Sequence, residues 1–162
     1  MNYFKVSLAI FVALAASRFI PHPPNFTSLL ALSFYIPALI GIRYLPALIM
    51  SFVITDFVIG FHGTTLFTWG SVVVIGLGSK YFISSILTRI SGALLGACLF
   101  FIITNFGVWI VGYPKSLHGL VSCYTLALPF FKNTLLASLF YSSILYFIYD
   151  YVLKGNLIYT EK

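Results

Sequence analysis

The stretch SRFIPHPPNFT, residues Ser17–Thr27, separates two apolar segments near the start of the chain. A tight turn needs only a glycine or a proline and a few polar residues. This break carries an arginine, a histidine, an asparagine and three prolines. We expect a stiff loop, because each proline fixes its φ angle and lacks an N–H group that needs a partner. A stiff loop loses little entropy when it closes over a ligand, so Arg18, His22 and Asn25 are candidates for ligand contacts.

The chain on both sides of this loop is too apolar for a soluble protein. Of its 162 residues, 60% are hydrophobic and 7% are charged, and the mean hydropathy is +1.04. A soluble domain carries roughly 25% charged residues. The composition therefore predicts one all-α integral membrane domain that covers residues 1–162 and lies in a lipid bilayer. The net charge of +6 does not point to nucleic acid, because the basic residues lie at the ends of apolar segments.

Six apolar runs predict a compact bundle of six transmembrane helices. Ser91 and Asn133 are suitable N-cap residues for the fifth and sixth helices. The second and third helices are short, and we expect a tight hairpin around Arg43. Residues 120–131 contain Pro129 and are too short to cross about 30 Å of hydrocarbon, so we expect an interfacial or re-entrant segment there. The predicted spans are residues 5–20, 27–42, 44–60, 66–86, 92–111 and 134–153.

The distribution of basic residues predicts that both termini lie on the inner side of the membrane. Cytoplasmic loops carry an excess of lysine and arginine. Residues 1–17 also fit a cleavable signal peptide, but their small residues continue as a helical stripe, which favours a retained helix. With six spans, the inner face holds Lys5, Arg43, Lys80, Arg89, Lys154 and Lys162, and the outer face holds Arg18, Lys115 and Lys132.

The same topology brings most of the polar side chains to the outer side, including all three histidines. Ligand sites combine apolar walls with a few convergent polar groups, so we expect a small-molecule site between the first, third and fifth loops. The excess of basic residues on this face favours an anionic ligand. The candidate substrate-binding residues are Arg18, His22, Asn25, Asp56, His62, Asn105, Trp109, Lys115 and His118.

Asp56 is the most unusual of these residues, because it lies within the apolar segment SFVITDFVIG, residues 51–60. An acid at the bilayer centre costs about 2.5–3.5 kcal/mol, so we expect it to face the bundle with a partner. It either contacts a ligand and holds the first loop, or it forms a structural pair, for instance with Arg18. Trp109 shares a helix face with Asn105 and serves either as a stacking surface or as an interfacial anchor.

A stripe of small residues on the first helix is a different signal. Ala9, Ala13 and Ala16 recur at helical spacing. Small residues let helix backbones approach closely inside lipid. The stripe packs either within the bundle or against another membrane subunit, for which these three alanines are the candidate contacts.

No motif indicates catalysis. The stretch GLGSK, residues 76–80, does not have the spacing of a phosphate-binding loop, and the chain has no His-Glu-x-x-His or Gly-x-Ser-x-Gly motif. We therefore predict no enzyme activity, no catalytic residue, no cofactor and no bound metal. A metal site or intramembrane enzyme built from Asp56 and the three histidines is a less favoured alternative.

Three stretches carry a resemblance to a family of small bacterial membrane proteins of uncharacterised function. They are RFIPHPPNFTSLLAL (residues 18–32), SFVITDFVIGFH (residues 51–62) and ITNFGVWIVGYPKSLHGLVSCYTLALPFFKNTLL (residues 103–136). The resemblance covers nearly the whole chain. That family in turn resembles the substrate-binding S components of energy-coupling factor (ECF) transporters, which are six-helix proteins that capture vitamins or related micronutrients.

The resemblance implies a multi-pass protein of the bacterial inner membrane that takes part in vitamin uptake. It implies that the outer loops, especially the first and fifth, close over the substrate. It also implies that Ala9 and Ala13 dock onto a transmembrane coupling subunit that carries two ATPases. An accessory or structural subunit of a larger membrane complex is the alternative function.

Overall fold

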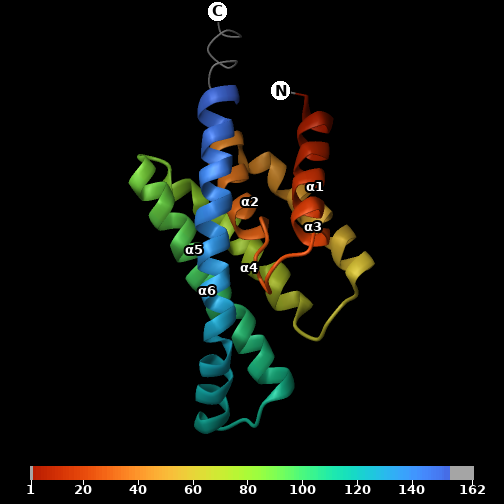
Figure 1. Ribbon diagram of the computed structural model, residues 1–162, viewed down its shortest axis with the longest axis vertical. Helices are drawn as coiled ribbons and strands as arrows, with labels where there is room; N and C mark the ends of the chain where they lie inside the picture. The colour runs from red at the N-terminus through yellow and green to blue at the C-terminus, as the bar shows by residue number, and fades with distance from the viewer. Residues whose placement is uncertain (1, 154–162) are drawn as a thin grey trace, which may run out of the picture.

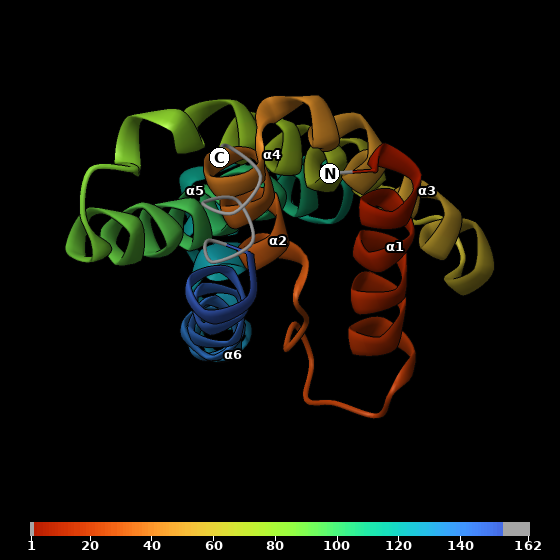
Figure 2. The same cartoon turned by 90° about the horizontal axis from the view of Figure 1, so that it is seen from above.

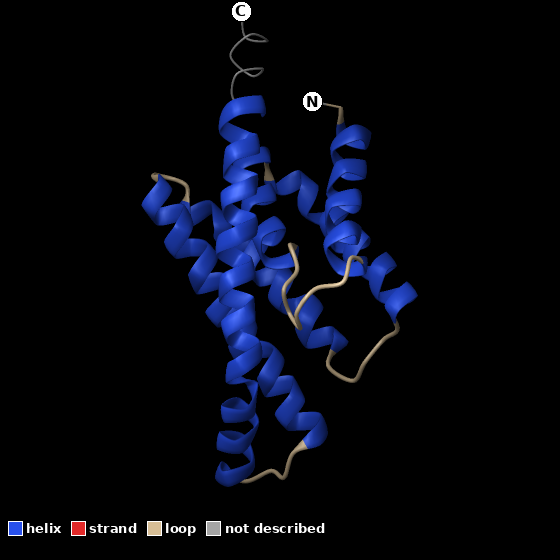
Figure 3. Cartoon of the chain, viewed as in Figure 1, coloured by secondary structure: helices blue, strands red, loops and turns tan. Residues whose placement is uncertain are grey.

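The computed structural model describes residues 2–153, and this part of the chain is helical with no β-strand (Figure 3). Lys154 and Lys162, which entered the topology prediction, lie outside the described residues. Short π- or 3₁₀-helical turns occur at η1 (Ile36–Ile40), η2 (Ile42–Tyr44), η3 (Ser79–Phe82) and η4 (Tyr149–Leu153). The α-helices of the described range are α1 (Tyr3–Phe19), α2 (Leu29–Tyr35), α3 (Leu45–Ile59), α4 (Thr65–Gly78), α5 (Ile86–Gly112) and α6 (Leu117–Ile148).

The all-α class predicted from the composition is confirmed for the described residues. Three helical stretches, Ile42–Ile59, Ile86–Gly112 and Leu117–Tyr151, are long and apolar enough to cross a membrane, and Leu29–Ile40 is a shorter apolar helix. Large apolar side chains such as Leu95 and Phe140 are exposed on the surface, as suits a chain whose helices face lipid.

The short helix α2 forms the centre of the bundle. All seven of its residues are buried, and it packs against α4, α5 and α6. Pro37 lies two residues after the end of α2, and because proline cannot donate the usual helical hydrogen bond, the helix continues as the π-turn η1. Gly41, with φ of 122°, ends this turn, and the next three residues form η2, which contains Arg43. The connection between α2 and α3, where the sequence analysis placed a tight hairpin around Arg43, is therefore short.

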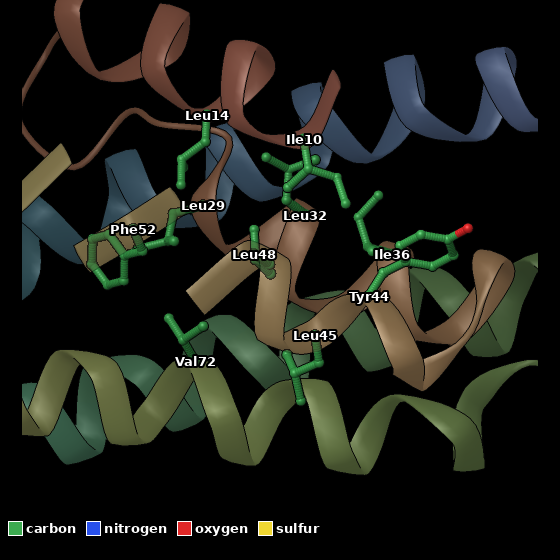
Figure 4. Packing of buried hydrophobic residues seen from close by; sticks show 10 residues of the cluster. All are labelled: Ile10, Leu14, Leu29, Leu32, Ile36, Tyr44, Leu45, Leu48, Phe52 and Val72. Carbon is green, nitrogen blue, oxygen red and sulfur yellow. The ribbon is translucent and has the colours of Figure 1, made fainter. Parts of the chain in front are cut away.

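A cluster of buried apolar side chains joins α2 to its neighbours (Figure 4). Leu14 of α1 and Leu48 of α3 are completely buried, as is Val72 of α4. The full cluster is Ile10, Leu14, Leu29, Leu32, Ile36, Tyr44, Leu45, Leu48, Phe52 and Val72. The core therefore fixes α1, α3 and α4 around one side of α2.

The two long helices begin earlier than the sequence analysis predicts. Ser85, not Ser91, caps α5: its hydroxyl accepts the N–H of Thr88 at 3.2 Å, and the hydroxyl of Thr88 accepts the N–H of Ser85 at 2.9 Å. This reciprocal capping box satisfies two free backbone donors. Ser116, not Asn133, caps α6 by accepting the N–H of Gly119 at 3.1 Å.

Residues 120–131 are the beginning of α6 and do not form a separate segment. The helix continues through Pro129 to Ile148, and α6 packs extensively against α5. Membrane helices tolerate an internal proline because neighbouring groups satisfy the freed backbone atoms. The prediction of a break before residue 134 was wrong, because it gave Pro129 more weight than this packing.

The start of α1 and the end of α6 lie at the same end of the molecule (Figure 1). The long α5–α6 hairpin extends towards the opposite end, beyond the loop that joins α1 to α2. Seen from above, α1 and α6 stand apart, and α2 lies between and behind them (Figure 2).

Candidate functional site

A cavity of about 620 Å³ lies towards the loop end of the bundle. The end of α1, the loops of residues 20–28 and 60–64, and the helices α2, α3, α4, α5 and α6 contribute to its wall. Its volume lies within the range of about 300–1,000 Å³ typical of small-molecule sites. Polar lining residues are Arg18, His22, Asn25, Thr27, Asp56, His62, Thr64, Thr68, Thr104, Asn105, Tyr113, Cys123, Thr134 and Ser138, and apolar ones include Phe52, Phe100 and Phe130.

An ion pair in the cavity wall joins α1 to α3. Nη2 of Arg18 lies 2.6 Å from Oδ1 of Asp56, and Nη1 donates to Oγ1 of Thr55 at 2.6 Å. The other carboxylate oxygen accepts a hydrogen bond from Nε1 of Trp69 on α4 at 2.7 Å. The Arg18 guanidinium also lies over the ring of Phe52, 4.7 Å from its centre. Asp56 therefore has the structural partner that the sequence analysis gave as one of two alternatives, and it also lines the cavity.

The loop between α1 and α2 is fastened at both ends. Its N-terminal end is held by Ser17, whose Oγ lies 2.7 Å from Oγ of Ser28 and accepts the N–H of Ser28 at 3.1 Å. Both hydroxyls are buried. Ser28 is the N-cap residue of α2, but its side chain makes no capping bond there. Its hydroxyl instead ties the start of α2 to α1.

The middle of the loop reaches α6. The N–H of Phe26 donates to the carbonyl of Pro23 at 3.0 Å, which closes a turn, and Asn25 has φ of 62°. Proline followed by asparagine suits the two central positions of a turn that needs a positive φ at the second. The side chain of Asn133 on α6 donates to the carbonyl of Pro24 at 3.0 Å. The prolines and Asn25 thus set the shape of the loop across the space between α1 and α6.

The predicted histidines separate in the structure. His22 and His62 line the cavity, whereas His118 is exposed at the start of α6 and does not. His62 follows Gly60, which ends α3 with φ of 110°, and its Nδ1 lies 2.9 Å from Oγ1 of Thr64. Within residues 2–153, no three histidine, cysteine, aspartate or glutamate side chains lie close enough together to hold one metal ion.

Two other predicted site residues, Trp109 and Lys115, do not line the cavity. The indole Nε1 of Trp109 donates to the carbonyl of Pro114 at 3.0 Å. The ammonium group of Lys115 donates to the carbonyl of Trp109 at 2.8 Å and also to the carbonyl of Ile110. Both side chains therefore satisfy backbone groups at the end of α5, where free carbonyls are available. Asn105, four residues before Trp109, does line the cavity.

Several polar lining residues escaped the sequence analysis. Thr68, Thr104, Thr134 and Ser138 lie within apolar helices, and Tyr113 follows α5. A recognisable signal was present, because Thr134 and Ser138 are four residues apart and so share a helix face. Single threonines and serines are common in membrane helices, where they bond to their own helix. Only the packing of α4, α5 and α6 shows that these particular ones meet.

A second hollow, the apolar groove, lies between α1 and the end of α6. Its volume is about 370 Å³. Ala9 and Ala13 belong to its wall, and both are exposed, as is Ala16 further along α1. The lining residues are Lys5, Val6, Ala9, Ile10, Ala13, Leu32, Tyr35, Ile36, Leu39, Ile40, Leu145, Ile148 and Tyr149. The three alanines thus remain uncovered by the described residues.

Comparison with known proteins gives one match. A family model described as "Family of unknown function (DUF6580)" matches residues 1–158. No curated protein and no solved structure matches the chain.

Proposed function

We propose that this chain, which belongs to the DUF6580 family of unknown function, is the substrate-capture subunit of an ATP-driven importer for a vitamin-like micronutrient. The observation that supports this proposal is the cavity of about 620 Å³, whose wall joins polar groups from five helices and their connecting loops to phenylalanine and leucine side chains. This mixture is typical of small-molecule sites. Such a subunit binds its substrate without covalent chemistry.

The proposal places the cavity on the outer side of the bacterial inner membrane. The chain then crosses the membrane six times, in the manner of an ECF S component, with both termini inside. In this orientation Lys5 and Arg43 lie together on the inner side, since the hydroxyl of Tyr3 donates to the carbonyl of Arg43 at 3.3 Å. Basic residues favour that side. Substrate enters from outside between the loop of residues 20–28 and the loop of residues 60–64.

The partner in this proposal is a transmembrane coupling subunit with two ATPases. Ala9, Ala13 and Ala16 are exposed on α1, and small residues let another helix approach closely. The exposed alanines and the groove beside them also suit an accessory subunit of a larger complex, which is the second candidate function. The two functions differ in the cavity, because only the importer needs a ligand there.

Native mass spectrometry of the protein, purified in detergent from its own host, tests the proposal. We expect a small organic molecule bound in a one-to-one ratio that is released on denaturation. We also expect a metabolite extract from the host to raise the melting temperature of the emptied protein, because a ligand that binds only the folded state stabilises it by mass action. An empty protein that a whole extract does not stabilise, but that carries a fixed protein partner, supports the accessory subunit instead.

A further inference from the structure

We propose that the ligand of the cavity is an uncharged molecule that is rich in hydrogen-bond donors, with an apolar part. This inference rests on the proposed binding function and specifies the chemical class of its substrate. It differs from the anionic ligand expected from the sequence, because the structure pairs Arg18 with Asp56 and leaves Lys115 and Lys132 outside the cavity wall.

The charges of the cavity wall cancel each other. Among the described residues that line it, Arg18 is the only lysine or arginine and Asp56 the only acid. Arg18 bonds to Asp56 and to Thr55, each at 2.6 Å, and both oxygens of Asp56 have a donor. A charged ligand would lose its hydration on entering the cavity and would meet no unpaired charge of opposite sign in the wall. That loss is costly in a low-dielectric site. The wall therefore favours a ligand with no net charge.

The hydroxyl groups of three threonines present acceptors to the cavity. Thr68 donates its proton to the carbonyl of Thr64 at 3.2 Å. Thr104 and Thr134 donate to the carbonyls four residues earlier, at 2.8 and 2.9 Å. A hydroxyl has one proton but two lone pairs, so each oxygen keeps its capacity to accept. These oxygens come from α4, α5 and α6, and each can accept a hydrogen bond from a molecule that fills the space between those helices.

Asn105 and His22 add acceptors of the same kind. The amide nitrogen of Asn105 donates to the carbonyl of Phe101 at 2.8 Å, which orients the amide and leaves its oxygen as the free acceptor. Nδ1 of His22 lies 2.7 Å from the carbonyl of Pro23, and because a carbonyl only accepts, Nδ1 carries the proton. In the neutral ring Nε2 is then an acceptor. Acceptors from three helices and the first loop thus surround the same space.

Ser138 is the observation that points most directly to a ligand. Its side chain is 2% exposed, it belongs to the cavity wall, and its hydroxyl oxygen has no hydrogen-bond partner among the described residues. A buried hydroxyl without a partner is unfavourable. A hydroxyl or amide group of a bound molecule would satisfy it. Phe100 and Phe130 line the same cavity and offer the apolar part of the ligand a matching surface.

The experiment separates a host metabolite extract by charge and measures the melting temperature of the emptied, detergent-purified protein. The probes are the fraction retained by an anion exchanger, the fraction retained by a cation exchanger, and the neutral fraction that neither retains. We expect the neutral fraction alone to raise the melting temperature. Stabilisation by either retained fraction alone overturns the uncharged ligand and leaves the binding function standing. If neither the whole extract nor any fraction stabilises the protein, the binding function fails and the inference fails with it.

Two matched serine variants test whether the ligand contacts the polar wall. Ser138 and Ser142 lie one turn apart on α6 and are both buried, but only Ser138 lines the cavity. For Ser138→Ala, we expect that about ten times more of the neutral fraction is needed to reach the half-maximal rise in melting temperature. Ser142→Ala should leave that amount unchanged. Equal effects of the two variants, or no effect of either, would contradict a ligand that bonds to this wall.

Discussion

The cavity and the apolar groove both have wall residues from α1, α2 and α6, but the chemistry of the two walls differs. The cavity contains an ion pair, five threonines and an unpartnered serine. The apolar groove is lined mainly by aliphatic side chains and alanines. Polar groups within a membrane are costly and persist where they have partners or a function. The wall of the cavity therefore selects an occupant by hydrogen bonding, whereas the wall of the groove selects one by shape.

This comparison predicts that changes in the cavity wall alter stability and ligand binding together. Changes in the groove should alter only what docks there. The variants below follow in order of their expected effect on stability.

The largest effect is expected for Asp56→Ala. This substitution removes the carboxylate partner of Arg18, whose side chain is 14% exposed in the cavity wall. Breaking such a pair lowers the free energy of unfolding by about 3–5 kcal/mol. Thermal unfolding in detergent measures the loss. The double variant Arg18→Met with Asp56→Leu is the control, because it removes both charges and should recover most of the stability. If the single and double variants unfold alike, the ion pair is not what joins α1 to α3.

Ser17→Ala should have the next largest effect. It leaves the buried Ser28 N–H without its acceptor and removes one partner of the Ser28 hydroxyl, which also donates to the carbonyl of Ala13 at 3.4 Å. Leaving such groups unsatisfied costs about 1–3 kcal/mol. The matched control is Ser143→Ala, whose exposed hydroxyl bonds only to its own helix, at Leu139. Equal melting temperatures for both variants would show that the Ser17–Ser28 contact does not hold the loop.

Asn133→Ala tests the attachment of the loop to α6. It removes one partly exposed hydrogen bond, to the carbonyl of Pro24, so we expect a stability loss of about 0.5–1.5 kcal/mol. Hydrogen exchange at Phe26 and Thr27 should become faster, because opening of the loop limits that exchange. Lys132→Ala, at the exposed neighbouring position, is the control. Unchanged exchange in Asn133→Ala would mean that the loop is held at its ends alone.

The smallest effect on stability is expected in the groove. The double variant Ala9→Leu with Ala13→Leu enlarges exposed side chains. The free energy of unfolding should therefore change by no more than about 0.5 kcal/mol. Ligand binding should also persist, but transport in reconstituted vesicles should be lost because a partner helix can no longer approach α1. Val12→Leu, exposed on α1 but outside the groove, should transport normally. Normal transport by the alanine variants would exclude this face as the docking surface.

Parts of the fold were predictable because they depend on local composition. The apolar runs located α1 and α3 closely, but they divided α6 and carried the fourth span past the end of α4 at Gly78. The positions of Arg18 and Asp56 suggested their pairing, since an acid within an apolar segment needs a partner. The helix starts at Ser85 and Ser116 were missed. Each of these serines accepts a hydrogen bond from the backbone N–H three residues later. Many serines in the sequence stand where such a bond is possible, but few form it.

The candidate site was predictable only in part, because its members come from different helices. Sequence position placed Asn105 and His62 towards one end of the bundle, and both line the cavity. Lys115 and His118 were predicted on the same reasoning and lie elsewhere. Position along a helix determines the height of a residue but not which neighbour it faces. Thr104, Thr134 and Ser138 were missed because nothing local distinguishes a hydroxyl that faces a cavity from one that faces lipid.

The sequence by itself determined that the described part of the chain is helical, with stretches long and apolar enough to cross a membrane, because hydrophobic burial and the cost of charge in lipid act on each segment separately. Only the tertiary structure decided which charges cancel and which polar groups remain open. Arg18 and Asp56 lie 38 positions apart along the chain, and the packing of α1 on α3 joins them. The crossing of α4, α5 and α6 turns the hydroxyls of Thr68, Thr104 and Ser138 to one space, because helix packing selects a single face of each helix.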